Sequence, residues 1–167
     1  MVSIPFPNNS NNRKKNFNND NSGLVPPQNI QAEESVLGGI LLDPDAIGRI
    51  ADLLRPEAFY ISSHQEIYKT ALMLHTQGKP TDLTSMSAWL ADNGALEKVG
   101  GNNKLVELVE NVSSTASIEQ VANLISDKFL RRELIKSGNE VIQLGFDQSQ
   151  DTEEVLDKAE QKIFQIS

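Results

Sequence analysis

The sequence predicts an all-α protein in which a small helical globular head is followed by a long antiparallel helical hairpin. Aromatic residues make up only 5% of the chain while aliphatic residues are plentiful, so the core must be aliphatic, as helical bundles often are. Apolar residues also recur three and four positions apart through most of the chain, which is the period of an α-helix. At 167 residues, the length favours one or two compact units.

Residues 1–23 are rich in asparagine and contain too few apolar side chains to form a core. The entropy of ordering such a segment is not offset, so we expect it to be a disordered leader. Its basic cluster, Arg13-Lys14-Lys15, is interpreted as a solvated charge run, with a localisation signal or a phosphate contact as the alternatives.

The head is expected over residues 24–112, and its first two helices are marked by capping residues. Asn29 follows an extended Pro-Pro approach and is placed to cap a helix that carries Glu33-Glu34 in its first turns. Asp43-Pro44 supplies a new cap and a first-turn proline for a second, short helix that stops around Pro56.

Three more helices complete the expected head. Ser63 and Glu66 have the spacing of a capping box, which predicts a third helix over roughly 63–77. Either residue of Thr81-Asp82 can cap a fourth helix, and the turn at Gly100-Gly101 precedes a fifth.

The hairpin is expected over residues 116–167, after the polar stretch Ser113-Ser114-Thr115, where we place a subdomain boundary. Its apolar pattern predicts one helix of about 28 residues, longer than the globular average of about 12, and a last helix opened by Asp151. Two helices with apolar residues on more than one face cannot bury all of them against each other, so the hairpin predicts self-association or a partner. The residues expected at that interface are Ile118, Val121, Ile125, Leu130, Leu134, Ile142, Leu156 and Ile163.

Charge and composition disfavour several classes of protein. The formal net charge is −8, and head and hairpin are both acidic without a stripe of Lys and Arg, which disfavours autonomous nucleic-acid binding. With no cysteine, the chain has no disulfide, thiolate metal site or cysteine nucleophile. No apolar run is long enough for a signal peptide or a membrane span, so we expect no membrane partner.

The sequence predicts no catalytic, cofactor-binding or metal site. The phosphate-binding string G-x-x-x-x-G-K-[ST] is absent, and the glycines of Gly94–Gly101 are interpreted as a turn. His64 and His75 have no carboxylate or second histidine at helical ligand spacing, which favours structural roles. Acidic pairs such as Glu33-Glu34 lie at helix starts and complement the helix dipole, and nothing in the pattern indicates the burial that acid–base chemistry needs. We therefore expect this chain not to be an enzyme.

Four short patterns follow one another in the chain. They are A-E-x-x-x-L-G-x-x-L from Ala32, F-Y-x-x-x-H from Phe59, G-x-P-x-D from Gly78, and the pair Gly100-Gly101. In their order and spacing they resemble the N-terminal domain of DnaB-type replicative DNA helicases over about residues 25–166.

The sequence departs from that family pattern at two positions and in its leader. Lys104 stands where the family usually has an aromatic residue, and Val121 stands where it usually has tyrosine near the start of the hairpin. These departures concern packing. The Asn-rich leader lies outside the family core and fits a plastid or cyanobacterial-type copy, so the expected location is a bacterial-type cytoplasm or a plastid stroma.

The resemblance implies the collar half of a helicase acting in DNA replication. Family hairpins pair so that six subunits form a trimer of dimers, and primase docks on this collar, with a helicase loader as a further partner. The linker helix and the RecA-like motor would lie beyond Ser167, so the chain looks truncated; the parent would be the ATP-dependent helicase that uses ATP and Mg²⁺ and contacts DNA as a ring. The residues implied as fold determinants of the head are Leu37, Gly38, Phe59, His64, Asp82, Gly100 and Gly101.

Alternatives from other functional classes remain open. The chain could be a stand-alone helical interaction module, or a weak binder of single-stranded nucleic acid through Arg13-Lys14-Lys15 with Arg131 and Arg132. A small enzyme that uses carboxylates is the least supported reading.

Overall fold

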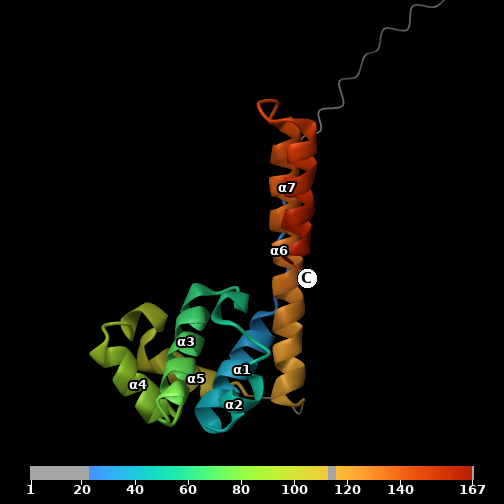
Figure 1. Ribbon diagram of the computed structural model, residues 1–167. Helices are drawn as coiled ribbons and strands as arrows, with labels where there is room; N and C mark the ends of the chain where they lie inside the picture. Colours follow the sequence, from blue (N-terminus) through green and yellow to red (C-terminus); the bar gives the residue numbers. More distant parts are fainter. Residues whose placement is uncertain (1–22, 113–115, 167) are drawn as a thin grey trace, which may run out of the picture.

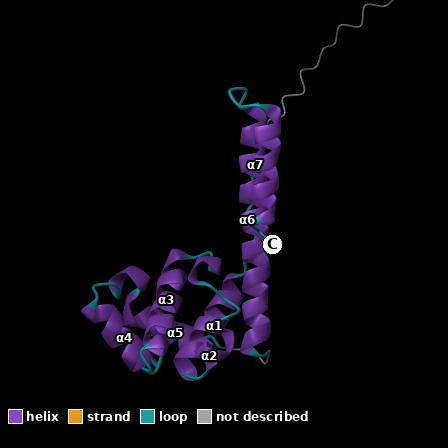
Figure 2. Cartoon of the chain, viewed as in Figure 1, coloured by secondary structure: helices purple, strands orange, loops and turns teal. Residues whose placement is uncertain are grey.

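The structure is a computed structural model that describes residues 23–112 and 116–166. Within these ranges the chain forms seven α-helices and two short 3-10 helices, and it contains no β-strand. The predicted all-α class is confirmed (Figure 2). The predicted disordered leader, apart from Gly23, and the polar stretch 113–115 lie outside the described residues.

The helices divide between a head and a projecting hairpin. The head contains α1 (Ile30–Leu42), α2 (Ala46–Ile50), η1 (Pro56–Ala58), α3 (Ser62–Thr76), α4 (Leu83–Asp92), η2 (Glu97–Val99) and α5 (Gly101–Glu110). The hairpin is formed by α6 (Ile118–Phe146) and α7 (Thr152–Phe164). Figure 1 shows the head beside the first half of α6, while α7 runs back along the second half. The predicted antiparallel hairpin is therefore present.

Capping side chains explain where most helices begin. Asn29 accepts a hydrogen bond from the Ala32 N–H at 3.0 Å, and Asp82 accepts one from the Ser85 N–H at 3.0 Å. At the start of α6, Ser117 and Gln120 form a reciprocal capping box. These side chains satisfy backbone N–H groups that lack a partner in the first turn of a helix.

The predicted capping box at the start of α3 is wrong. The N-cap position belongs to Ile61, which makes no side-chain cap, and Ser63 already lies inside the helix. The N–H groups of Tyr60 and Ile61 instead face the carboxylate of Glu33, at 2.6 and 3.4 Å. A residue distant in sequence thus holds the segment that leads into α3, while the N-cap position of α3 itself makes no side-chain cap.

The core is built around α1. Val36, Leu37 and Ile40 are at most 1% exposed, because α3, α5 and α6 pack around them. The rings of Phe59 and Tyr68 lie 4.9 Å apart beside this helix, an aromatic pairing that adds to their burial. The Tyr68 hydroxyl donates to the Leu54 carbonyl at 2.8 Å, and burial raises the pKa of this phenol.

The first turns of α6 belong to this same core. Val121, Ala122 and Ile125 are 7%, 0% and 1% exposed and pack with the buried residues of the head. The prediction that Val121 and Ile125 lie at an open hairpin interface is therefore wrong, because α1 and α2 already cover this part of α6. One core thus contains residues from both sides of 113–115, so the predicted boundary does not separate two independent cores.

Gly38 marks the closest approach of α1 to α5 and yields a test of this packing. An added Cβ would overlap the carbonyl oxygen of Leu108 and the Val112 side chain, whereas at Gly39 it would meet only the Ile118 Cδ1 at 3.4 Å. We expect Gly38→Ala to lower the free energy of unfolding by about 3 kcal/mol, because backbone cannot move aside cheaply. The matched change Gly39→Ala should be neutral or stabilising by up to about 1 kcal/mol, since alanine favours helix.

Urea unfolding followed by circular dichroism measures both effects. Equal stabilities of the two alanine variants would contradict the close approach of α1 and α5.

Candidate protein interaction site

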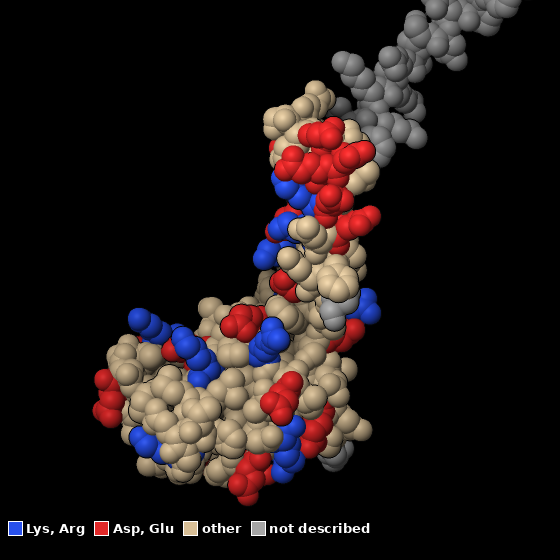
Figure 3. All heavy atoms as spheres, in the orientation of Figure 1, with Lys and Arg blue, Asp and Glu red and all other residues tan. Residues whose placement is uncertain are grey.

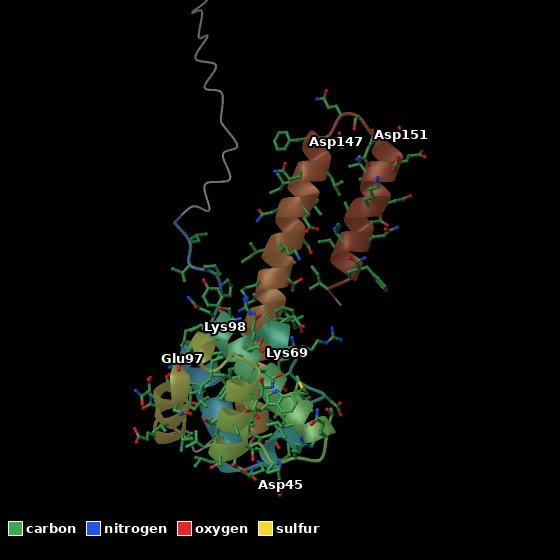
Figure 4. All side chains as sticks on the ribbon, turned by 90° about the vertical axis from the view of Figure 1, so that its left-hand side faces the viewer. Asp45, Lys69, Glu97, Lys98, Asp147 and Asp151 are labelled. Atoms are coloured by element: carbon green, nitrogen blue, oxygen red, sulfur yellow. The ribbon has the colours of Figure 1, made fainter. Side chains whose placement is uncertain are left out.

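The outer hairpin, which we define as residues 129–166, has almost no core of its own. Beyond Ile125, the described part of α6 contains one buried residue, Ser137. All of α7 lies in the described part of the chain, and none of its residues is buried. Each helix covers only one side of the other, so the remaining faces meet solvent (Figures 1 and 4).

Large apolar side chains occupy these open faces. Five residues of the predicted interface are exposed: Leu130, Leu134, Ile142, Leu156 and Ile163. Ile118, the remaining predicted residue, is half-buried against the head. Exposed apolar side chains gathered on one part of a protein are typical of interaction surfaces, which makes the outer hairpin the candidate interaction site.

Three further exposed apolar residues of the outer hairpin were not predicted from the sequence: Ile135, Phe146 and Phe164. Phe146 is 71% exposed and Phe164 is 81% exposed. Each phenylalanine is the last residue of its helix, α6 or α7. An aromatic residue at a helix end, where polar residues commonly lie, was the available signal.

Polar contacts join the two hairpin helices in place of a core. Lys162 on α7 pairs with Glu140 on α6 at 2.7 Å, and this contact lowers the pKa of the Glu140 carboxyl. Val141, Ala159, Ile163 and Phe164 line a shallow apolar groove of about 490 Å³ beside this pair. The hairpin therefore offers apolar grooves as well as single exposed side chains.

The far end of the hairpin is acidic. Figure 3 shows Asp and Glu side chains gathered there, and Asp147 and Asp151 flank the turn in Figure 4. Glu153 and Glu154 follow in the first turn of α7. The hydroxyl and N–H of Ser149 donate to Asp147 and hold the pKa of this carboxyl below its usual value. Such a surface repels phosphate and suits a protein partner with basic groups.

Arg132 fixes the hairpin to the head. Its guanidinium donates to the carbonyls of Pro27 at 2.7 Å and Ala58 at 2.6 Å, so it ties α6 to two separate segments. The same group lies over the rings of Tyr60 and Phe129, with centroid distances of 5.5 and 5.8 Å. We call this arrangement the Arg132 joint. It couples the direction of α6 to the head.

A buried hydrogen-bonded pair, Glu33 and His64, orders the head beside this joint. Glu33 and His64 are each 1% exposed, and the His64 Nδ1 lies 2.8 Å from the Glu33 carboxylate. The expectation that Glu33 shows no sign of burial is wrong. Its position on the buried face of α1, one turn before Val36 and Leu37, was the signal for it.

The remaining predicted fold determinants lie in the core or at turns. Leu37 and Phe59 are buried, and Gly38 contacts α5. The Ser85 N–H holds the pKa of the Asp82 carboxyl below its usual value at the start of α4. Gly100 and Gly101 have φ values of 102° and 73°, a left-handed conformation that favours glycine.

The described residues contain neither a metal-binding cluster nor a membrane-spanning helix. Within 23–112 and 116–166, no group of three or more His, Asp or Glu side chains is placed to hold a metal ion. In the same ranges, every helix is too short or too polar to cross a bilayer.

Comparisons with known proteins give a consistent result. A family model described as DnaB-like helicase N terminal domain matches residues 25–127. Replicative DNA helicase DnaB of a Nostoc species is 54% identical over 151 residues, which are 90% of this chain and 17% of that protein. Replicative DNA helicase DnaC of Bacillus subtilis is 37% identical over 143 residues, which are 86% of this chain and 32% of that protein. The chain thus spans less than a third of the length of these relatives.

Solved structures agree with the sequence relatives. The crystal structure of the N-terminal domain of DnaB helicase from Mycobacterium tuberculosis matches with a TM-score of 0.79 at 37% identity, covering 84% of this chain and 99% of that one. A DnaB-like replicative helicase, described with its interactions with primase, matches with a TM-score of 0.69 at 29% identity, covering 83% of this chain and 32% of that one.

The Arg132 joint predicts unequal effects of two neighbouring substitutions. We expect Arg132→Ala to lower the free energy of unfolding by about 2 kcal/mol, because two hydrogen bonds from a charged group are lost. Arg131→Ala should change it by less than about 0.5 kcal/mol, since Arg131 is exposed and pairs only with Asp127 of its own helix, at 3.0 Å. Chemical denaturation of both variants measures the difference, and equal losses would argue against the joint.

The Glu33–His64 pair predicts a second contrast. We expect Glu33→Gln to destabilise the fold by about 2 kcal/mol, because the amide nitrogen would face a buried donor. The neighbouring Glu34→Gln should cost less than about 1 kcal/mol, since Glu34 only pairs with Lys104 near the surface, at 2.8 Å. Thermal unfolding of both variants tests the prediction. An equal loss of stability in Glu34→Gln and Glu33→Gln would contradict it.

Proposed function

We propose that this chain, which belongs to the DnaB-like helicase N-terminal domain family, is the assembly and docking part of a replicative DNA helicase. In this proposal, its outer hairpin pairs with the outer hairpin of a second copy, and three such dimers close into a collar. The collar then presents a docking surface to primase and to a helicase loader. The relatives share the family and extend well beyond the length of this chain.

One observation carries the proposal: the outer hairpin exposes apolar side chains on both helices. Leu134 is 54% exposed and Leu156 is 59% exposed. A stable interface removes roughly 800 Å² from each partner, and it needs an apolar centre with a polar rim. The exposed residues supply such a centre, and Lys162 with Glu140 supplies polar groups beside it.

A second copy of the same hairpin is the simplest partner for this surface. Two-fold pairing brings identical patches together, so each exposed residue gains an apolar contact on the other copy. The acidic far end, with Asp147 and Asp151, opposes close approach of identical ends, and it remains free for a different partner. We assign the docking of primase to surfaces left open after pairing, which fits the match to a helicase described with its interactions with primase.

Unwinding would belong to the parent protein. In the proposal, a motor domain C-terminal to this chain binds ATP and Mg²⁺ and contacts DNA as a ring, while the collar sets the ring geometry. The relatives are bacterial, which favours a bacterial-type cytoplasm, and a plastid stroma is the alternative.

Direct binding of single-stranded nucleic acid is less well supported. The guanidinium of Arg132 is committed to the carbonyls of Pro27 and Ala58, and Arg131 pairs with Asp127. The two cations of that alternative that lie in the described residues, Arg131 and Arg132, are therefore already engaged in contacts within the chain.

The proposal predicts self-association through the outer hairpin. Sedimentation equilibrium should show dimers or larger species for this chain, and Leu134→Asp and Ile163→Asp should each give monomers, because a carboxylate would be stranded in an apolar seam. Leu42→Asp is the matched control, since Leu42 is 56% exposed but lies on the head. A cooperative unfolding transition in each of the three variants would show that the head remains folded.

A strict monomer at high micromolar concentration would contradict the assembly. Docking is tested separately by titrating labelled primase against the chain, and binding should be lost or weakened by substitutions on the outer hairpin alone. Primase binding that survives every hairpin substitution and falls with changes on the head would refute the assigned surface.

A further inference from the structure

A groove of about 790 Å³ opens where the first described residues pass between η1 and the middle of α6. We call it the N-terminal groove. Phe59, Tyr60 and Phe129 form its aromatic side, and Leu24, Val25 and Ile135 form its open rim. Figure 4 shows that these first residues lie on the side of α6 away from α7. The first described residues therefore lie apart from the seam between the hairpin helices, and Glu140, which pairs with Lys162, borders both the groove and the seam.

The rim of the groove is unusually open for apolar residues. Leu24 and Val25 are 74% and 73% exposed, and Ile135 is 47% exposed. The Arg132 joint holds the underlying side chains in place, because its guanidinium lies over both Tyr60 and Phe129. A fixed aromatic surface with an uncovered apolar rim is suited to an extended apolar segment.

The chain itself contains such a segment. Apolar residues of the leader gather in Val2-Ser3-Ile4-Pro5-Phe6-Pro7, ahead of its asparagines. Ile4 and Phe6 each precede a proline, which favours extended backbone at both positions. In an extended chain alternate residues share a face, so Val2, Ile4 and Phe6 can point together. Aromatic grooves recognise extended proline-containing segments, because little entropy is lost on binding.

The connection and the charges also fit. Residues 8–22 join this segment to the rim of the groove, and this number of residues is long enough for the segment to reach the groove of its own chain. The linker carries Arg13-Lys14-Lys15, while the groove is lined by the acidic residues Glu57, Glu133 and Glu140 and the basic residues Arg132 and Lys136. Glu140 is already paired with Lys162, so Glu57 and Glu133 are the carboxylates that can attract the basic linker.

We propose that residues 2–7 dock in the N-terminal groove of the same chain, with Ile4 and Phe6 against Tyr60, Phe129 and Ile135. Docking covers the apolar rim and fastens the leader beside the Arg132 joint. Ile135 belongs both to this groove and to the outer hairpin, whereas Val25 and Tyr60 belong to the groove alone, so substitutions can separate docking of the leader from hairpin pairing.

Paramagnetic relaxation enhancement in the full chain tests the docking. The chain has no cysteine, so Asn8→Cys gives a single site for a nitroxide label. We expect the amide signals of Tyr60, Phe129 and Ile135 to broaden strongly, and those of α4 to remain sharp. The broadening should be lost in Ile135→Asp and in Val25→Asp, both of which change exposed positions and leave the core intact.

Leu134→Asp is the matched control, because Leu134 is adjacent, similarly exposed and outside the groove lining. In Leu134→Asp, the amide signals of Tyr60, Phe129 and Ile135 should broaden as they do in the parent chain, even if hairpin pairing is abolished. The proposal is overturned by absent or uniform broadening, by broadening that persists in both groove variants, or by its loss in Leu134→Asp. Broadening between a labelled chain and a separate isotope-labelled chain would assign the contact to a second copy and would likewise overturn it.

Discussion

The packing of the first turns of α6 against α1 sets the arrangement of the whole molecule. Val121, Ala122 and Ile125 are part of the core of the head, yet the same helix continues without interruption for 29 residues. At a rise of about 1.5 Å per residue it extends about 43 Å, so its far half stands clear of the head (Figure 1). One continuous helix therefore gives the hairpin a defined direction from a buried anchor.

Polar contacts add direction to this apolar anchor. The Arg132 joint binds α6 to the segments around Pro27 and Ala58. The hydroxyl of Ser126, also on α6, donates to the Leu53 carbonyl at 3.1 Å. Hydrogen bonds are directional while apolar packing is not, so these contacts restrict rotation of α6 about its own axis. Glu33, which faces His64 and the N–H groups before α3, holds the segment that carries Ala58.

The helices could be predicted from local patterns because their ends are marked by local chemistry. Asn29, Asp82 and Asp151 each cap the helix that follows them, as their positions in the sequence suggested. Contacts between residues far apart in the sequence could not be predicted from such local patterns. Glu33 resembled a first-turn acid until the fold placed His64 against it. Val121 and Ile125 fit the apolar repeat of α6 as well as Leu130 and Leu134 do, and only the position of α1 separates the covered residues from the exposed ones.

The lack of buried residues on α7 also bears on how the molecule reaches this conformation. A helix of 13 residues is marginal in water without packing, and α7 receives little from α6 alone. In the proposed assembly, formation of α7 is thermodynamically linked to pairing, so the helical content of α7 would rise with the concentration of the second copy. The core shared by the head and the first turns of α6 does not depend on this step, whereas the tip of the hairpin would complete its folding on assembly.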